Sequence, residues 1–376
     1  MQQSSSEETN THDFPALRGM QGGRACYTIM CPLRLIPRLF HYDDSGLPAE
    51  ARAQRAINPG RIPEITDYLT QNSDNYILPA ITASLDQEAE FVPMGDDIVP
   101  LAGKLKIPRK ARLLINDGQH RRAAIERAIT KKRELGHDSI PVLLFIDEGL
   151  KRSQQMFADL NRHAIRPSTS LNTFFDKRDS ASTLARCVMQ EVPCFRDLTE
   201  VEKSSLPLKS RKLFTLSAIK NASWRFLEKR KRDIATGHDH SQCIAFWSGV
   251  CQIMPDWEEA LRNESLPIHL RTNLPMHLRK GSIHAHGVFL QALAVSCSSL
   301  KHEAPEYAPD WYAERLRILV NENWQRSNPE WERRCLQSGR ISKSHTSVEL
   351  LACYLKRRLD IPLSDKQLEL EGALTS

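Results

Sequence analysis

Seven consecutive residues in the first third of the chain have types that could bind a phosphate group. They are Asn116, Asp117, Gly118, Gln119, His120, Arg121 and Arg122. The two arginines offer planar, fork-shaped donors that match phosphate oxygens. His120 could act as a general base beside that phosphate, or it could bind it as a protonated donor. Asp117 could hold a metal ion for phosphoryl transfer, although an Asp-Gly pair is more common as a simple turn. The stretch is therefore a candidate phosphate site, with Asp117 and His120 as its catalytic candidates.

The elements around this stretch would place it at the start of a helix. Leu113–Ile115 is an apolar run that predicts a strand, and a helical pattern starts at Gln119. Asn116 or Asp117 could cap that helix, and Gly118 supplies the backbone freedom of a sharp turn. The first turn of a helix favours an anion through its unpaired N–H groups and its dipole. The alternative that composition leaves open is a capped helix whose arginines face solvent.

The order of these parts resembles the DGQHR family of ParB/sulfiredoxin-like domains, whose name motif is spelled by Asp117 to Arg121. The resemblance implies an α/β (α+β) ParB/sulfiredoxin-like N-terminal domain. It also implies that Arg61, at a helix start, contributes to the same pocket, and that Asn161 and Arg162 close over it from the far side. From the residues alone, Arg61 is equally a solvated helix-start arginine, and Asn161 is a helix C-cap.

The composition permits a nucleic-acid partner without establishing one. The chain has 376 residues, a formal net charge of +6 and a pI near 8.8. It lacks the run of about 18 apolar residues that a transmembrane helix needs. The N-terminus has no basic and apolar signal-peptide regions, so we expect a cytoplasmic protein with no membrane partner. The nine cysteines include no Cys-x-x-Cys pair, which predicts reduced, mostly buried thiols and no metal site.

Cys31 is a candidate functional thiol. It follows a predicted strand and precedes Arg34 and Arg38, whose charges would lower the thiol pKa and make it reactive. The alternative is a buried cysteine that acts as a small hydrophobic side chain.

Three segments are predicted. Residues 1–22 form a flexible N-terminal segment, 23–180 the DGQHR ParB-like domain, and 181–376 a mostly α-helical domain. Within the second segment, residues 86–110 are predicted to form a loop or hairpin insertion.

Two basic clusters in the helical part are predicted to lie on helices and to contact the DNA backbone. The first consists of Lys209, Arg211 and Lys212. The second consists of Lys229, Arg230, Lys231 and Arg232, at the end of a helix predicted over 224–232. Helix-turn-helix spacing is absent, so the sequence identifies no recognition helix.

The chain as a whole resembles the DndB family of DNA sulfur modification proteins. Members belong to DNA phosphorothioation gene clusters and are regarded as negative regulators that bind DNA near the cluster's promoter. The resemblance therefore implies a repressor whose partner is double-stranded promoter DNA, with other sulfur-modification proteins as further partners. A repressor of a palindromic site would be a homodimer. One alternative is a ParB-like enzyme that either binds and hydrolyses a nucleoside triphosphate or nicks DNA. The nucleoside triphosphate is the one candidate cofactor. Another is a non-enzymatic subunit of the modification machinery.

Overall fold

The computed structural model describes residues 11–40, 59–95, 101–147, 152–162 and 167–375. Its internal contacts divide the chain into two compact units, Met1–Ile165 and Arg166–Ser376. The sequence places the boundary later, after residue 180. The difference arises because α6 (Thr169–Phe175) packs on helices of the second unit, where Ser170 Oγ donates a 3.0 Å hydrogen bond to Ser217 Oγ.

The first unit is built on a seven-stranded sheet with the order β4-β5-β1-β2-β7-β3-β6. Its strands are β1 (Thr11–Gln21), β2 (Arg24–Pro32), β3 (Ile81–Leu85), β4 (Glu90–Pro93), β5 (Ala102–Pro108), β6 (Leu113–Asp117) and β7 (Ser139–Ile146). Among the described residues, β3 and β7 form the one parallel pair of this sheet. The antiparallel pair β4 and β5 confirms the hairpin predicted within 86–110. The mixed α/β class predicted for the chain is confirmed.

Strand β1 corrects the predicted flexible segment over residues 11–21, while residues 1–10 lie outside the described residues. Phe14 and Ala16 are buried while their neighbours face outward, which is the alternation of a half-buried strand. Gly22 and Gly23 have φ of +56° and +74° and connect β1 to β2 in a two-residue hairpin. The glycines therefore mark a hairpin turn, where the sequence suggested a mobile lead-in.

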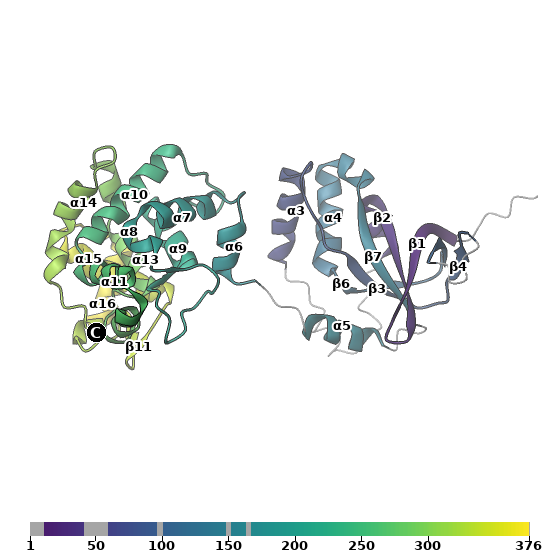
Figure 1. Cartoon of the computed structure of the whole chain (residues 1–376). Helices are drawn as coiled ribbons and strands as arrows, with labels where there is room; N and C mark the ends of the chain where they lie inside the picture. The colour runs from purple at the N-terminus through teal and green to yellow at the C-terminus, as the bar shows by residue number, and fades with distance from the viewer. Residues whose placement is uncertain (1–10, 41–58, 96–100, 148–151, 163–166, 376) are drawn as a thin grey trace, which may run out of the picture. The chain divides into compact units, whose positions relative to one another are not determined.

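Helices cover the sheet of the first unit. The two longest, α3 (Arg61–Gln71) and α4 (Gln119–Lys131), lie side by side (Figure 1). The short helix α1 (Ile36–Leu39) packs on α4, and α5 (Ser153–Arg162) packs on β6. Every residue of β3 is buried, as expected for a strand covered on both faces.

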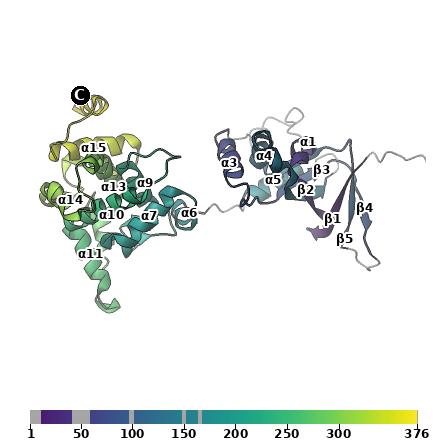
Figure 2. The same cartoon turned by 90° about the horizontal axis from the view of Figure 1, so that it is seen from above.

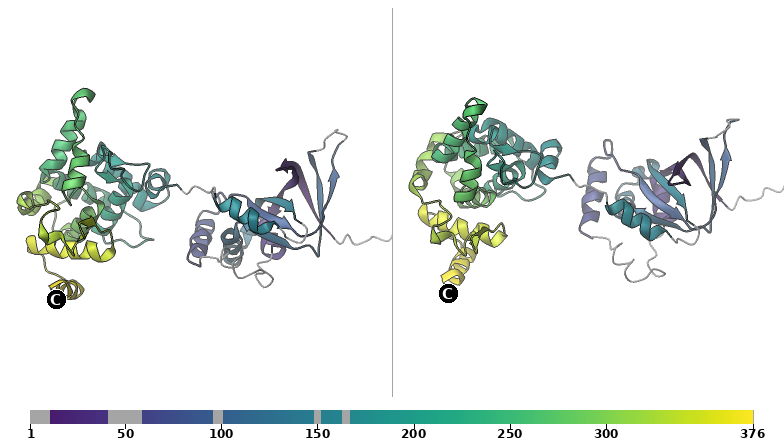
Figure 3. Two further views of the ribbon diagram at one scale, coloured as in Figure 1. Left: turned by 90° about the horizontal axis from the view of Figure 1, so that it is seen from below. Right: turned by 60° about the horizontal axis from the view of Figure 1, so that its bottom comes forward.

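The second unit is mostly helical, as predicted for this part of the chain. Its helices are α6, α7 (Ser180–Glu191), α8 (Pro193–Arg196), α9 (Leu216–Phe226), α10 (Gly237–Gln252), α11 (Pro255–Ser265), α12 (Leu274–Gly281), α13 (Gly287–Ser296), α14 (Pro309–Leu316), α15 (His345–Arg358) and α16 (Asp365–Thr375). The apolar helix α13 is buried between α9 and α15 (Figure 2). The last two helices, α15 and α16, pack on each other at the C-terminal end (Figure 3).

Short strands and aromatic rings complete this unit. Strands β8 (Thr199–Glu200) and β9 (Phe214–Thr215) pair in parallel, and β10 (Leu336–Gln337) pairs with β11 (Arg340–Ile341). The core is rich in buried aromatic side chains, with Phe226 stacked on Phe246 at a ring distance of 4.2 Å. Such rings bury a large apolar area and help to hold the helices of this unit together.

Two global predictions concern the whole chain. Eight of the nine cysteines are buried, which confirms the predicted burial of most of the thiols. Within the described part of the chain, no helix combines the length and the apolar character needed to cross a lipid bilayer.

Candidate functional site

The predicted strand, turn and helix are present and meet at Gly118. Strand β6 ends at Asp117, and helix α4 begins at Gln119. Gly118 has φ of +111°, and a Cβ atom there would lie 3.0 Å from Cγ1 of Ile81. A glycine is therefore needed both for the backbone conformation and for space. Gly118 is itself the N-cap residue, so the prediction that Asn116 or Asp117 caps the helix is wrong.

Arg121 is held by its own chain. Its Nη2 donates to Oδ2 of Asp117 at 2.6 Å and to the backbone carbonyl of Ala80 at 3.0 Å. Its Nε is buried and has no hydrogen-bond partner among the described residues. Asp117 thus neutralises the guanidinium that the sequence offered to a phosphate.

All three guanidinium nitrogens of Arg122 donate hydrogen bonds within the protein. Its Nη2 and Nε donate to the carbonyls of Pro37 and Phe40 at 3.0 and 3.1 Å. Its Nη1 donates to Oε2 of Glu126 at 2.6 Å. The bonds to Pro37 and Phe40 tie α4 to the end of α1, and the three bonds together occupy all three nitrogens of the guanidinium.

Asn116 and Gln119 point into the protein. Asn116 is fully buried and donates through Nδ2 to Ser84 Oγ at 2.7 Å, while its Oδ1 has no partner among the described residues. Gln119 donates through Nε2 to the carbonyl of Ile115 at 3.3 Å. Both amides therefore support the turn from the sheet side.

The other residues predicted for this pocket are placed as follows. His120 is half-buried in the first turn of α4, beside the two arginines. Arg61 is the exposed first residue of α3 and forms no hydrogen bond or ion pair with a described residue. Asn161 and Arg162 end α5, and their side chains lie outside the described part of the structure. The structure thus brings Asn116 to Arg122 together as a connected unit, and the wider pocket stays a prediction.

Cys31 is not a reactive thiol. Its side chain is completely buried, and burial raises its pKa to about 12. The shift is opposite to the predicted lowering of the pKa by Arg34 and Arg38, because burial disfavours the charged thiolate. In the described part of the chain, no three His, Cys, Asp or Glu side chains are grouped so that they could hold a metal ion.

The first basic cluster lies in a loop before β9, so the predicted helix is wrong there. Arg211 donates through Nε to Glu264 at 3.0 Å, and Lys212 donates through Nζ to the carbonyl of Asp197 at 2.6 Å. Lys209 is exposed, and its ammonium has no partner among the described residues. Two of these three side chains are therefore part of the internal structure of the unit.

The second cluster follows the end of α9, so the helix predicted over 224–232 ends early. Helix α9 stops at Phe226, and Glu228 has φ of +57°. Lys229 pairs with Asp239 at 2.9 Å. Arg230 and Lys231 are exposed, and neither side chain pairs with a described residue, while Arg232 is exposed as well.

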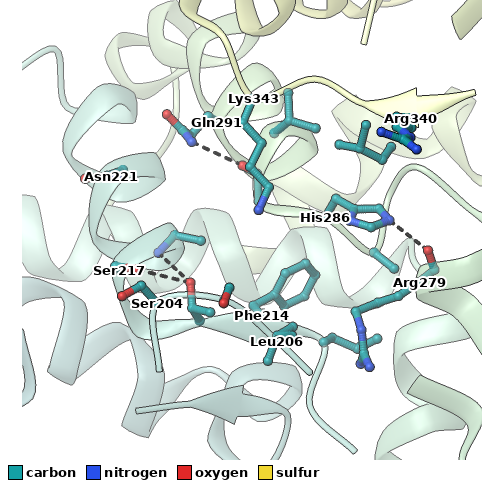
Figure 4. A pocket seen from close by; sticks show the side chains of 18 of the residues that line it. Ser204, Leu206, Phe214, Ser217, Asn221, Arg279, His286, Gln291, Arg340 and Lys343 are labelled. Atoms are coloured by element: carbon teal, nitrogen blue, oxygen red, sulfur yellow. Dashed lines mark hydrogen bonds between the residues drawn. The ribbon is translucent and has the colours of Figure 1, made fainter. Parts of the chain in front are cut away.

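A cavity of about 490 Å³ in the second unit was not predicted from the sequence. Its wall comes from the loop before β9, the start of α9, the end of α12, the start of α13, and the segment around β11 (Figure 4). Five of the lining residues are arginine or lysine, and none is aspartate or glutamate. These five are Arg279, Lys280, Arg326, Arg340 and Lys343.

Two of the five cations are structural. The buried guanidinium of Arg279 donates to the backbone carbonyls of Pro207, Leu208, Ser210 and Lys212, and burial lowers its pKa. Arg326 donates to the carbonyls of Lys280 and Gly339. The side chains of the exposed Lys280, Arg340 and Lys343, by contrast, form no hydrogen bond or ion pair with any residue that the structure describes.

His286 lies at the entrance of α13, in the wall of this cavity. Its Nε2 is 2.9 Å from the carbonyl of Arg279, so a neutral ring can donate to that oxygen. Burial, followed by the charges of Arg326, Lys343 and Arg279, lowers its pKa to about 4. The backbone hydrogen bond opposes this shift. The ring is therefore neutral near pH 7.

Sequence reasoning missed the cavity because its residues come from five separate segments. One local signal was available. His286-Gly287 begins an apolar helix without a Ser, Thr, Asn or Asp cap, and no side chain caps α13 in the structure. Many anion sites use the free N–H groups at a helix start next to glycine. This pattern alone does not identify an anion site, because the cations that line the cavity come from other segments of the chain.

Comparison with known proteins relates the chain to one family. A family model named DndB and described as DNA-sulfur modification-associated matches residues 14–362. Neither the curated proteins nor the solved structures include a match to this chain.

Proposed function

The chain belongs to the DndB family of DNA-sulfur modification-associated proteins, and we propose that it is a DNA-binding negative regulator of a DNA phosphorothioation gene cluster. On this proposal it works in the cytoplasm as a homodimer on the promoter of its own cluster. Its first unit is a ParB/sulfiredoxin-like domain, and the other sulfur-modification proteins are its further partners.

The observation that carries the proposal is the distribution of charge. Residues 166–376 contain 31 lysines and arginines against 25 aspartates and glutamates, whereas residues 1–165 contain 21 of each. The entire net charge of +6 therefore belongs to the helical unit. A unit with net positive charge attracts the DNA phosphates, and each cation that contacts a phosphate releases a bound counterion.

Exposed cations with no carboxylate partner are the best candidates for these contacts. Lys209, Arg230 and Lys231 meet this condition among the described residues, unlike Arg211 and Lys229, which are paired with acids. A paired cation would have to give up its carboxylate before it could bind a phosphate. We therefore expect the loop after α9 to contact the DNA backbone.

The alternative of a nucleotide-hydrolysing or DNA-nicking enzyme depends on the strand-turn-helix at Gly118. The guanidinium groups of Arg121 and Arg122 would have to leave Asp117, Glu126 and backbone carbonyls to bind a phosphate. That exchange is unfavourable unless the ligand replaces each bond. The contacts therefore support a structural role for these arginines.

A gel-shift titration of the full-length protein tests the proposal. Its own upstream promoter fragment is compared with scrambled DNA over a range of salt concentrations, without nucleotide. We expect tighter binding to the promoter fragment. The Arg230→Gln/Lys231→Gln variant should show a shallower salt dependence, by about 0.9 in the log–log slope for each phosphate that it no longer neutralises. The control is Arg109→Gln/Lys110→Gln, an exposed pair of the same residue types in the first unit. Equal affinity for scrambled DNA would contradict the repressor.

A further inference from the structure

The cavity of the second unit has the charge of an anion-binding site. Lys280, Arg340 and Lys343 are among the residues that line it, and none of the lining residues is acidic. Like charges that line one cavity repel one another, and no acidic residue lines it to offset this repulsion. A bound anion would neutralise these charges.

Backbone donors add to these charges. Helix α13 begins at the cavity with Gly287 and Val288, and its N-cap His286 makes no capping hydrogen bond. The first N–H groups of a helix have no acceptor within the helix, and they carry the positive end of its dipole. Gly287 also lets α13 approach α9, because a Cβ atom there would lie 2.9 Å from Cβ of Ala218.

The opposite wall carries no charge and combines apolar side chains with hydroxyl groups such as those of Ser204 and Ser217 (Figure 4). Figure 4 shows Lys343 reaching into the cavity from the C-terminal segment, with Leu206 and Phe214 on the far side. Leu208, which is 64% exposed, extends the apolar part of this wall. The ligand therefore needs a strongly anionic end and a less polar part. The volume of about 490 Å³ lies in the usual range for small organic ligands.

We propose that this cavity binds a phosphate ester of nucleotide size, with the phosphate held by Lys343, Arg340 and the N-terminus of α13. The organic part of the ligand packs against Leu206 and Leu208. Arg279 supports the loop that carries these leucines and does not itself reach the ligand, since its donors are bound to carbonyls. The phosphate ester can be a free nucleotide or the terminal phosphate of a DNA strand.

The test is a thermal-shift and calorimetric titration of the full-length protein without promoter DNA. The probes are AMP, adenosine, and a short single-stranded DNA with a 5′-phosphate, each also measured on variants. A ligand that binds the folded state raises the melting temperature. We expect AMP to do so and adenosine to fail. Arg340→Gln/Lys343→Gln should weaken AMP binding about tenfold or more, because it removes two charge-assisted contacts.

The matched control is Arg262→Gln/Lys366→Gln, which removes two exposed cations of the same unit outside the cavity. It should bind AMP like the unaltered protein. Binding of the phosphorylated DNA but not of AMP, again abolished in the cavity variant, would assign the phosphate to a DNA end. Absence of binding to every probe, or equal weakening in both variants, would overturn the inference. Because promoter DNA is absent from this experiment, its failure would leave the proposed repressor standing, and a failed gel shift would leave this site standing.

Discussion

The arginines of the Gly118 turn and the cations of the cavity differ in what neutralises them. Arg121 and Arg122 pair with Asp117 and Glu126 and with backbone carbonyls. Lys280, Arg340 and Lys343 have no such partners in the described structure. The turn is the more obvious basic site in the sequence, and yet its charges are already used by the fold.

The difference arises from how far each cation lies, along the sequence, from an acidic residue. Asp117 and Arg121 are four residues apart, as are Arg122 and Glu126, so the helix itself places each acid beside its arginine. The unpaired cavity cations come from two segments of the chain, and Lys280 and Lys343 are 63 residues apart. None of them has an acidic residue three or four positions away in the sequence. Basic residues that are close in sequence to acids are therefore poorer candidates for ligand binding than isolated ones.

The largest effect on stability is expected for Arg279→Met. This substitution tests whether the hydrogen-bonded cations of the cavity stabilise the fold, unlike its unpaired cations. The substitution leaves four partly buried carbonyls without their donor, and we expect a loss of about 3 kcal/mol in the free energy of unfolding. Urea unfolding of the full-length protein measures it. The adjacent Lys280→Met, at an exposed position, should change the free energy by less than about 0.5 kcal/mol. Similar losses in both variants would remove the distinction.

Arg122→Met tests whether the arginines of the turn are structural. It removes two hydrogen bonds that join α4 to the end of α1 and one to Glu126 within α4, and we expect a loss of about 2 kcal/mol. Exposed Arg127 lies on the same helix, so Arg127→Met is the matched control in the same urea titration. A stable Arg122→Met protein would mean that the guanidinium is free to serve a ligand.

A third prediction uses the pH dependence of His286. Its folded-state pKa of about 4 lies below the ordinary value of 6.5, so the unfolded chain binds the proton more tightly. Its contribution to stability is complete above about pH 6.5 and is lost as the pH falls toward 4. We expect this loss to reach about 1–2 kcal/mol, less than the full linkage value because the ring is partly accessible to solvent.

The measurement is the free energy of unfolding from pH 7 to pH 4 for the unaltered protein and for His286→Asn. Asparagine can still donate to the carbonyl of Arg279, but it does not titrate, so the variant should lose less stability in acid. His269→Asn, at an exposed position, is the control and should follow the unaltered protein. Parallel curves for all three proteins would exclude this role of the cavity charges.

Much of the first unit was predictable because its signals are local. The strand before Gly118, the helix after it, β7 and α3 follow from apolar runs, turn glycines and helical spacing. Strand β1 was missed because only Phe14 and Ala16 mark its buried face, and the glycines after it also suggest a linker. The helix over residues 224–232 was wrong because charge and length favour a helix, whereas Glu228 adopts a left-handed conformation that ends it.

The two sites show the same limit. The types of the residues at Gly118 predict phosphate chemistry, but the carbonyls of Pro37 and Phe40 that occupy Arg122 are more than 80 residues away in the chain. The cavity depends throughout on such long-range placement. Side-chain type therefore predicts which chemistry is available, whereas the tertiary contacts decide whether it is already in use.

The smallest effect on stability is expected for Arg340→Gln/Lys343→Gln. Removing two unpaired cations relieves repulsion and breaks no hydrogen bond to a described residue, so the free energy of unfolding should stay within about 0.5 kcal/mol or rise slightly. Unfolding at low and at high salt checks the cause, because any gain should shrink when salt screens the remaining charges. A decrease above about 1 kcal/mol would show that these cations hold the fold together. In that case the cavity would resemble the Gly118 turn, because its cations would stabilise the fold and would not be available to bind a ligand.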